Sequence, residues 1–163
     1  MNRDQPAAHP ESLRLADAAA TRALGRRIAA RWLSQPQSTG IVLLLSGDLG
    51  AGKTCLVQGL AEELGIAEPI TSPTFALAQH YGGSTGSRAT ALVHLDLYRL
   101  EQPAAADELL AQEEEEAQAC GALLAVEWPG RLSRWPAGAW QVELLLLDDR
   151  DPDRGRLASL RLP

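Results

Sequence analysis

A glycine-rich segment that contains one lysine is the part of this sequence whose residue types and spacing most clearly indicate chemistry. The segment fits the pattern G-x-x-x-x-G-K-[ST]. Glycines let successive backbone N–H groups converge on a phosphate, and a helix that starts behind them adds its positive N-terminal end. The pattern therefore predicts a loop that binds the phosphates of a nucleotide, made of Gly47, Asp48, Leu49, Gly50, Ala51, Gly52, Lys53 and Thr54.

The lysine and the threonine of this loop are the residues that would handle charge. Lys53 brings a flexible ammonium to the β- and γ-phosphates, and Thr54 offers a hydroxyl to Mg²⁺. The chain has 15 basic residues, and Lys53 is the one lysine among them. A glycine-rich turn that binds nothing is the alternative. The place of the sole lysine, and the strand and helix expected on either side, favour the phosphate loop.

Two acidic residues are candidates for completing a magnesium site. Asp96 follows the largely apolar run 92–95, and Glu127 follows the apolar run 122–126. A phosphate loop needs a second carboxylate at the end of a neighbouring strand. The spacing does not choose between the two, and each could simply mark a strand that reaches solvent. Ser72 and Thr74 offer hydroxyls that could sense the γ-phosphate, although their segment also fits a turn.

The pattern of apolar residues predicts the elements that must position these groups. Residues 41–46 are apolar without alternation, which is typical of a strand buried on both faces of a parallel sheet. Two hairpins are expected, across the connections 82–88 and 148–155. The expected fold class is α/β, a three-layer P-loop NTPase-like mixed sheet with helices on both faces and antiparallel hairpins. Strands are expected at 41–46, 75–81, 91–98, 122–126, 140–147 and 157–162, and helices at 17–33, 53–64 and 103–119.

Length, charge and composition limit the class of protein. The 163 residues suit one domain, expected at 15–163 after a flexible N-terminal tail at 1–14. The net charge of −6 argues against a general nucleic-acid-binding protein. The sole lysine is in the loop, so the Asn-Lys-x-Asp element of guanine recognition is absent. The sequence has no apolar run of the roughly 20 residues that span a membrane and no signal peptide, so a cytoplasmic protein without membrane contact is expected.

Four short motifs in order give the chain a resemblance to a known family. They are GDLGAGKT at 47–54, SPTF at 72–75, H-x-D-x-Y-R at 94–99 and Glu-Trp at 127–128. The chain resembles the TsaE (YjeE) family over about residues 15–162. The resemblance implies a magnesium-dependent P-loop ATPase that is weak alone and acts with a TsaD-like threonylcarbamoyl-transferase and its TsaB-like paralogue. ATP hydrolysis would reset that complex while it makes N6-threonylcarbamoyladenosine at position 37 of tRNAs that read ANN codons.

The resemblance also implies roles for individual residues. Thr54 and Glu127 would hold Mg²⁺, and Lys53 and Asp96 would be catalytic. The tRNA would be contacted only indirectly, and ATP and ADP would be the small-molecule ligands. One departure is Cys55, at a position where the family commonly has a second Ser or Thr. The other residues implied are a switch-like pair, Ser72 and Thr74, the motif residues Arg99 and Trp128, and Ala16 and Gly155 on the adenine side.

Two other functions fit the phosphate loop. A small-molecule kinase would need an acceptor pocket and a lid that carries arginines. The one candidate lid, 82–88, holds a single arginine, so Arg131 and Arg134 would have to serve as well. A nucleotide-sensing module would bind ATP tightly without hydrolysing it. Transfer of phosphate to an acceptor distinguishes the first from an ATPase, and the absence of phosphate release distinguishes the second.

Overall fold

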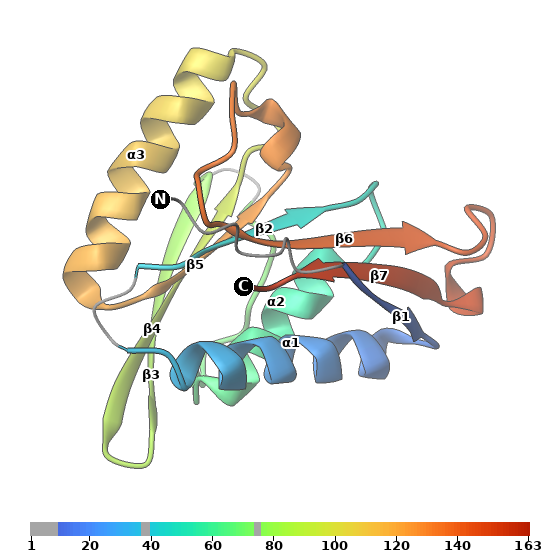
Figure 1. Cartoon of the computed structure of the whole chain (residues 1–163), viewed down its shortest axis with the longest axis horizontal. Helices are drawn as coiled ribbons and strands as arrows, with labels where there is room; N and C mark the ends of the chain where they lie inside the picture. The colour runs from blue at the N-terminus through green and yellow to red at the C-terminus, as the bar shows by residue number, and fades with distance from the viewer. Residues whose placement is uncertain (1–9, 37–39, 74–75) are drawn as a thin grey trace, which may run out of the picture.

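One mixed β-sheet with helices on both faces organises the chain. The computed structural model describes residues 10–36, 40–73 and 76–163. In this part of the chain, seven strands form a sheet in the order β1-β7-β6-β2-β5-β4-β3 (Figure 1). The helices are α1 (Ala18–Leu33), α2 (Lys53–Glu63) and α3 (Pro103–Cys120), with short 3-10 turns η1 (Pro129–Arg131) and η2 (Pro152–Arg154). The strands are β1 (Glu11–Leu15), β2 (Val42–Ser46), β3 (Ala78–Thr85), β4 (Arg88–Asp96), β5 (Leu123–Glu127), β6 (Trp140–Leu146) and β7 (Arg156–Arg161).

The centre of the sheet is parallel, as the unbroken apolar run of β2 predicts. Strand β2 pairs in parallel with β5 and with β6, and β5 pairs in parallel with β4. Successive side chains of a strand point to opposite faces. Leu43 and Leu45 therefore pack in the cluster under α1 and α2, whereas Val42 and Leu44 pack in the cluster under α3. The predicted three-layer α/β fold is confirmed (Figure 1).

The two hairpins form, but the first has a tighter turn than the sequence predicts. Residues Thr85 and Arg88 pair at the end of β3 and β4, so 82–85 extend the strand and two residues make the turn. The glycine-rich composition of 82–88 made this segment resemble a flexible connection. Gly83 lies against the backbone at Leu64 and Gly65, where a side chain would collide, which explains glycine in a strand there.

The N-terminal segment differs from the expected tail. Residues 1–9 lie outside the described part of the chain, but 11–15 form β1, antiparallel to β7. Leu13 and Leu15 alternate with polar residues, and Leu15 is buried in the core. An ion pair of 2.9 Å joins Arg27 of α1 to Glu11 of β1. The tail prediction was wrong for 11–14, because a five-residue amphipathic strand beside a polar stretch gives little signal by itself.

The helices start and pack as their sequences favour. Asp17 caps α1, with its side chain accepting a hydrogen bond of 2.8 Å from the backbone N–H of Ala20. Helices α1 and α2 cross in close contact because Gly25 and Gly59 carry no side chains. A Cβ at Gly25 would lie 2.2 Å from the carbonyl oxygen of Leu56, and one at Gly59 would lie 2.1 Å from that of Arg22. This contact fixes the helix that begins at the phosphate loop.

The topology brings the predicted functional residues to one edge of the sheet. The carboxyl ends of parallel strands share an edge, and β2, β4 and β5 end at the loop, Asp96 and Glu127 respectively. Asp96 and Glu127 stand opposite each other in the β4–β5 pairing. Among the described residues, no helix has both the length and the apolar character needed to cross a membrane.

Candidate functional site

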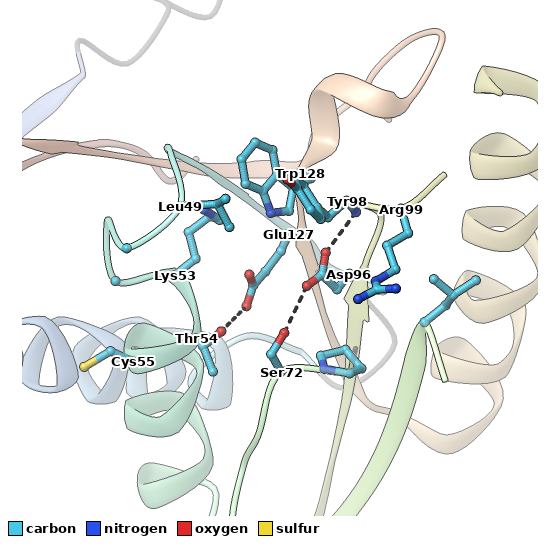
Figure 2. A pocket seen from close by; sticks show the side chains of 14 residues that line it. Leu49, Lys53, Thr54, Cys55, Ser72, Asp96, Tyr98, Arg99, Glu127 and Trp128 are labelled. Atoms are coloured by element: carbon cyan, nitrogen blue, oxygen red, sulfur yellow. Dashed lines mark hydrogen bonds between the residues drawn. The ribbon is translucent and has the colours of Figure 1, made fainter. Parts of the chain in front are cut away.

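A cavity of about 420 Å³ opens at the carboxyl ends of these strands, in front of the glycine-rich loop (Figure 2). Residues from β4, β5, α2 and the segment before β3 meet there. The cavity gathers most of the residues predicted from the sequence. Those that line it are Leu49, Gly50, Gly52, Lys53, Thr54, Ser72, Asp96, Arg99, Glu127 and Trp128.

The backbone of the loop adopts conformations that require glycine. Gly47 has φ of 144° and Gly52 has φ of 106°. A Cβ at Gly52 would lie 2.3 Å from Nη1 of Arg156, and one at Gly47 would lie 2.5 Å from the carbonyl oxygen of Leu144. The dihedrals therefore require glycine at both positions, and at Gly47 the neighbouring backbone also leaves no space for a side chain. Helix α2 begins directly after Gly52, so the positive end of its dipole faces the cavity.

Lys53 is buried and folded back onto its own loop. Its Nζ donates hydrogen bonds of 2.6 Å to the carbonyl of Gly47 and 2.9 Å to that of Asp48. The ammonium also lies 4.3 Å from the centroid of the Trp128 ring. Burial lowers the pKa of Lys53 below its usual value, and the nearby carboxylates, Glu127 foremost, oppose that shift.

Glu127 is the centre of a buried hydrogen-bond group. The hydroxyl of Thr54 donates to its Oε1 over 2.9 Å (Figure 2), and Nε2 of His94 lies 2.9 Å from the same oxygen. Only 3% of Glu127 is exposed. The alternative that Glu127 marks a strand reaching solvent is therefore wrong, because a carboxylate buried in this way requires partners.

Asp96 is oriented by two hydrogen bonds at the cavity wall, beside Glu127 of the neighbouring strand. Its Oδ2 accepts from the hydroxyl of Ser72 over 3.1 Å, and its Oδ1 accepts from the backbone N–H of Tyr98 over 2.9 Å (Figure 2). Ser72 thus contacts a predicted acidic residue directly. Thr74, the other predicted switch-like residue, lies outside the described residues.

The residue after Glu127 holds a strained backbone conformation. Trp128 has φ of 60°, in the left-handed region that residues other than glycine rarely adopt. The conformation turns the indole over Lys53 and against Tyr98, with ring centroids 4.8 Å apart. Leu77, which also lines the cavity, has φ of 60° as well. Strain of this kind costs about 1–3 kcal/mol per residue and clusters at functional sites.

The side chains at this site fit a magnesium ion bound together with nucleotide phosphates. Hydroxyl and carboxylate oxygens are ligands that Mg²⁺ prefers. Thr54 provides a hydroxyl and Glu127 a carboxylate, and the two groups are hydrogen-bonded to each other. Among the described residues, no group of three or more His, Cys, Asp or Glu side chains is arranged to hold a metal ion. Mg²⁺ is commonly held by one or two carboxylates plus substrate phosphates.

The other predicted residues that the structure describes lie around the loop and do not line the cavity. Gly47 and Asp48 supply the carbonyls that hold Lys53, and the carbonyl of the buried Ala51 accepts a hydrogen bond of 2.9 Å from Arg156. The two residues predicted for the adenine side adjoin each other. A Cβ at Gly155 would lie 3.2 Å from the carbonyl oxygen of Ala16. Their adenine role stays a prediction.

Sequence reasoning missed two contacts of this site. The sequence places His94 only in the H-x-D-x-Y-R motif, but in the structure it lies against Glu127. Tyr98 packs against Trp128 with its ring tilted and lines the cavity. A signal for His94 existed, because it stands two residues before Asp96 in a strand and so shares its face.

A mixed sheet with a glycine loop between β2 and α2, and acidic residues at the neighbouring strand ends, defines a P-loop NTPase-like protein. A model of the family described as threonylcarbamoyl adenosine biosynthesis protein TsaE matches residues 15–154. The chain belongs to this TsaE family, as the motifs predict.

Individual relatives agree with the family assignment. Over 105 residues the chain is 45% identical to the tRNA threonylcarbamoyladenosine biosynthesis protein TsaE of Nostoc sp., covering 64% of this chain and 62% of that one. It is 51% identical over 74 residues to the TsaE protein of Treponema pallidum, covering 44% of this chain and 51% of the relative. The chain thus matches less than two thirds of the length of these relatives.

A solved structure extends the similarity to most of the fold. The crystal structure of Bacillus subtilis YdiB superposes with a TM-score of 0.66 at 26% sequence identity. The superposition covers 93% of this chain and 84% of YdiB.

Proposed function

We propose that this chain is a magnesium-dependent ATPase that works in the synthesis of N6-threonylcarbamoyladenosine in tRNA. The observation that carries the proposal is the 2.9 Å contact between the Thr54 hydroxyl and Glu127, beside Lys53 in the cavity of the phosphate loop. The family name and the names of the relatives from Nostoc sp. and Treponema pallidum support the pathway.

The loop and its lysine would bind the phosphates of ATP. The N–H groups of 47–52 and the N-terminus of α2 offer partial positive charge to them. Lys53 would exchange the carbonyls of Gly47 and Asp48 for phosphate oxygens and offset the charge that develops between the β- and γ-phosphates. Thr54 and Glu127 would hold Mg²⁺, which neutralises phosphate charge when bound.

Asp96 would orient the water that attacks the γ-phosphate. The hydrogen bonds from Ser72 and from the backbone of Tyr98 fix its carboxylate at the cavity wall. Arg99 also lines the cavity and is a candidate for a stimulating positive charge. Weak activity of the isolated chain would follow if a partner completes this side of the site.

The proposed partners are a TsaD-like threonylcarbamoyl-transferase and a TsaB-like paralogue, with ATP hydrolysis resetting their complex between cycles. This chain would not transfer the threonylcarbamoyl group and would meet tRNA only through the complex. The kinase alternative loses support, because the candidate lid at 82–88 lies in the β3–β4 hairpin, and Gly83 of this hairpin packs against the C-terminal end of α2.

The test is phosphate release from MgATP by the purified chain, alone and with both partners from the same organism. We expect slow release alone, faster release with the pair, and no release by Lys53→Ala in either case. Formation of the modified nucleoside on unmodified tRNA should depend on the wild-type chain. Rapid phosphorylation of a small acceptor, or tight ATP binding without phosphate release in the full mixture, would overturn the proposal.

A further inference from the structure

A fully buried histidine stands behind the carboxylate proposed to hold magnesium. His94 lies on β4, two residues before Asp96, and has 0% of its surface exposed. Its Nε2 is 2.9 Å from Oε1 of Glu127, on the adjacent strand β5. The ATPase mechanism proposed for this chain assigns roles to Asp96 and Glu127, but none to His94.

The chemistry of the two groups determines which of them donates this hydrogen bond. A carboxylate oxygen only accepts, so Nε2 of His94 carries the proton and donates to Glu127. On the other side of the ring, Nδ1 is buried and has no hydrogen-bond partner among the described residues. A proton at Nδ1 would be a buried donor without an acceptor, which is costly. The burial of the ring therefore favours the tautomer that donates to Glu127.

The two hydrogen bonds to Glu127 converge on one of its oxygens. Thr54 and His94 both donate to Oε1, each over 2.9 Å. The hydrogen bonds between described residues thus leave Oε2 available for another ligand. Because Thr54 is itself a proposed ligand of Mg²⁺, its hydroxyl would turn toward the metal when MgATP binds. His94 would then be the donor that still holds Glu127.

We propose that His94 is a positioning residue that fixes the Glu127 carboxylate for magnesium, an inference that rests on the function proposed above. The hydrogen bond from Nε2 holds the carboxylate in the orientation in which its second oxygen faces the cavity. Groups that hold a metal-binding carboxylate from behind contribute about 10–100-fold to metal affinity. A histidine that only filled the core would contribute to stability and leave metal affinity unchanged.

The test measures how strongly Mg²⁺ and nucleotide assist each other's binding. Calorimetric titration with adenylyl-imidodiphosphate, in excess Mg²⁺ and in EDTA, gives two dissociation constants whose ratio is the metal coupling. A glutamine amide reaches about as far as Nε2 of histidine, whereas an asparagine amide reaches only as far as Nδ1. We expect His94→Asn to lower the coupling by about tenfold or more and His94→Gln to retain most of it.

The matched control is Leu95→Val, a change at an equally buried neighbour whose side chain packs on the opposite face, in the cluster under α3. It should lower thermal stability and leave the coupling at the wild-type value. In EDTA, all folded variants should bind the nucleotide within about threefold of wild type.

Each outcome decides between the inference and its rivals. Wild-type coupling in His94→Asn, or an equal loss in His94→Asn and Leu95→Val, would overturn the role of His94. If His94→Asn does not fold, His94→Leu decides, because it fills the core without a donor; wild-type coupling in that folded variant would overturn the role. A wild-type chain that binds no nucleotide in Mg²⁺ would remove the proposed function itself, which is a different result.

Discussion

At the scale of single residues, short-range spacing predicted the phosphate loop, but side-chain contacts between strands were not predictable. Gly47 to Thr54 are consecutive, so their sequence carries the whole signal. The contact of His94 with Glu127 depends on the pairing of β4 with β5 and on the rotamers of both residues. Neither the strand pairing nor the rotamers can be deduced from the residues next to His94 and Glu127 in the sequence. For the same reason, the sequence did not indicate that Glu127 is buried.

The burial of Glu127 changes what its substitution should do. From the sequence, a strand-end acid contributes little to the core, so Glu127→Ala should weaken magnesium dependence more than folding. Glu127 is only 3% exposed and accepts hydrogen bonds from Thr54 and His94. Removing its carboxylate therefore leaves the buried N–H of the His94 ring unpaired. We expect Glu127→Ala to lower the free energy of unfolding by about 1–3 kcal/mol. Urea denaturation measures this.

The control for this prediction is Glu127→Gln, whose amide oxygen still accepts from Thr54 and His94. It should cost less stability than the alanine variant while losing as much of the magnesium dependence of nucleotide binding. Equal stability of the alanine variant and the wild type would show that the buried group contributes nothing to folding.

At the scale of elements, continuous apolar runs identified the central strands, and helical spacing identified α1, α2 and α3. Strand β1 escaped prediction because its pairing partner β7 lies at the other end of the chain. The close contact of α1 with α2 could not be predicted from the sequence either. Gly25 and Gly59 fit ordinary helix positions in the sequence, and only the packing shows that they let the helices approach.

Gly59→Ala should therefore destabilise the protein although alanine favours helices. Alanine gains about 1 kcal/mol of helix propensity over glycine. Its Cβ would lie 2.1 Å from the carbonyl oxygen of Arg22, so α1 and α2 must separate, and such overpacking costs about 1–3 kcal/mol. We expect a lower melting temperature and weaker nucleotide binding, because α2 carries Lys53 and Thr54.

The control is Gly82→Ala in β3, where a Cβ would meet nothing within 4 Å. This variant should melt at or above the wild-type temperature. A Gly59→Ala variant more stable than wild type would mean that the two helices separate at no cost.

A hydrogen-bonded carboxylate joins α3 to the loop after η1. Asp107 accepts from the hydroxyl and from the backbone N–H of Ser133, over 2.6 Å and 3.0 Å. These bonds lower the pKa of Asp107, the side-chain bond foremost. A lowered folded-state pKa stabilises the fold above the ordinary carboxyl pKa, and this contribution is lost as the pH falls through the lowered value.

Ser133→Ala should raise the pKa of Asp107 toward the ordinary value, measured by NMR titration of its carboxyl carbon. The variant should also lose less stability on acidification than wild type, because the pKa of Asp107 then differs less between the folded and unfolded states. Ser159→Ala, in β7, should leave the titration of Asp107 unchanged. An unchanged titration in Ser133→Ala would contradict the assigned cause.

At the scale of the whole molecule, the fold class followed from the order of the elements, whereas the cavity did not. The order of strand, loop and helix, followed by more strands, permits few arrangements. The cavity of about 420 Å³ depends on turns at Leu77 and Trp128, whose left-handed backbones no local pattern predicts. Tertiary packing holds these conformations.

Nucleotide binding should stabilise the whole fold, because the proposed site joins α2 to β4 and β5. At a ligand concentration 100 times the dissociation constant, MgATP adds about 2.7 kcal/mol, which corresponds to a melting temperature higher by roughly 5–10 °C for a chain of this size. Differential scanning fluorimetry with and without EDTA measures the shift. Lys53→Ala should show none, and a wild-type shift in that variant would contradict the assigned loop.

The pairing of Asp96 with Glu127 has a consequence for how this protein tolerates changes in length. The two carboxylates face one side of the sheet because each stands at a matching position of its strand. One residue inserted within β4 or β5 would reverse the parity of that strand and turn its acid toward α3, whereas two would restore it. The two-residue turn between β3 and β4, where Gly86 has open space around it, carries no such constraint. Natural and engineered insertions should therefore be found more often at the β3–β4 turn than within β4 or β5.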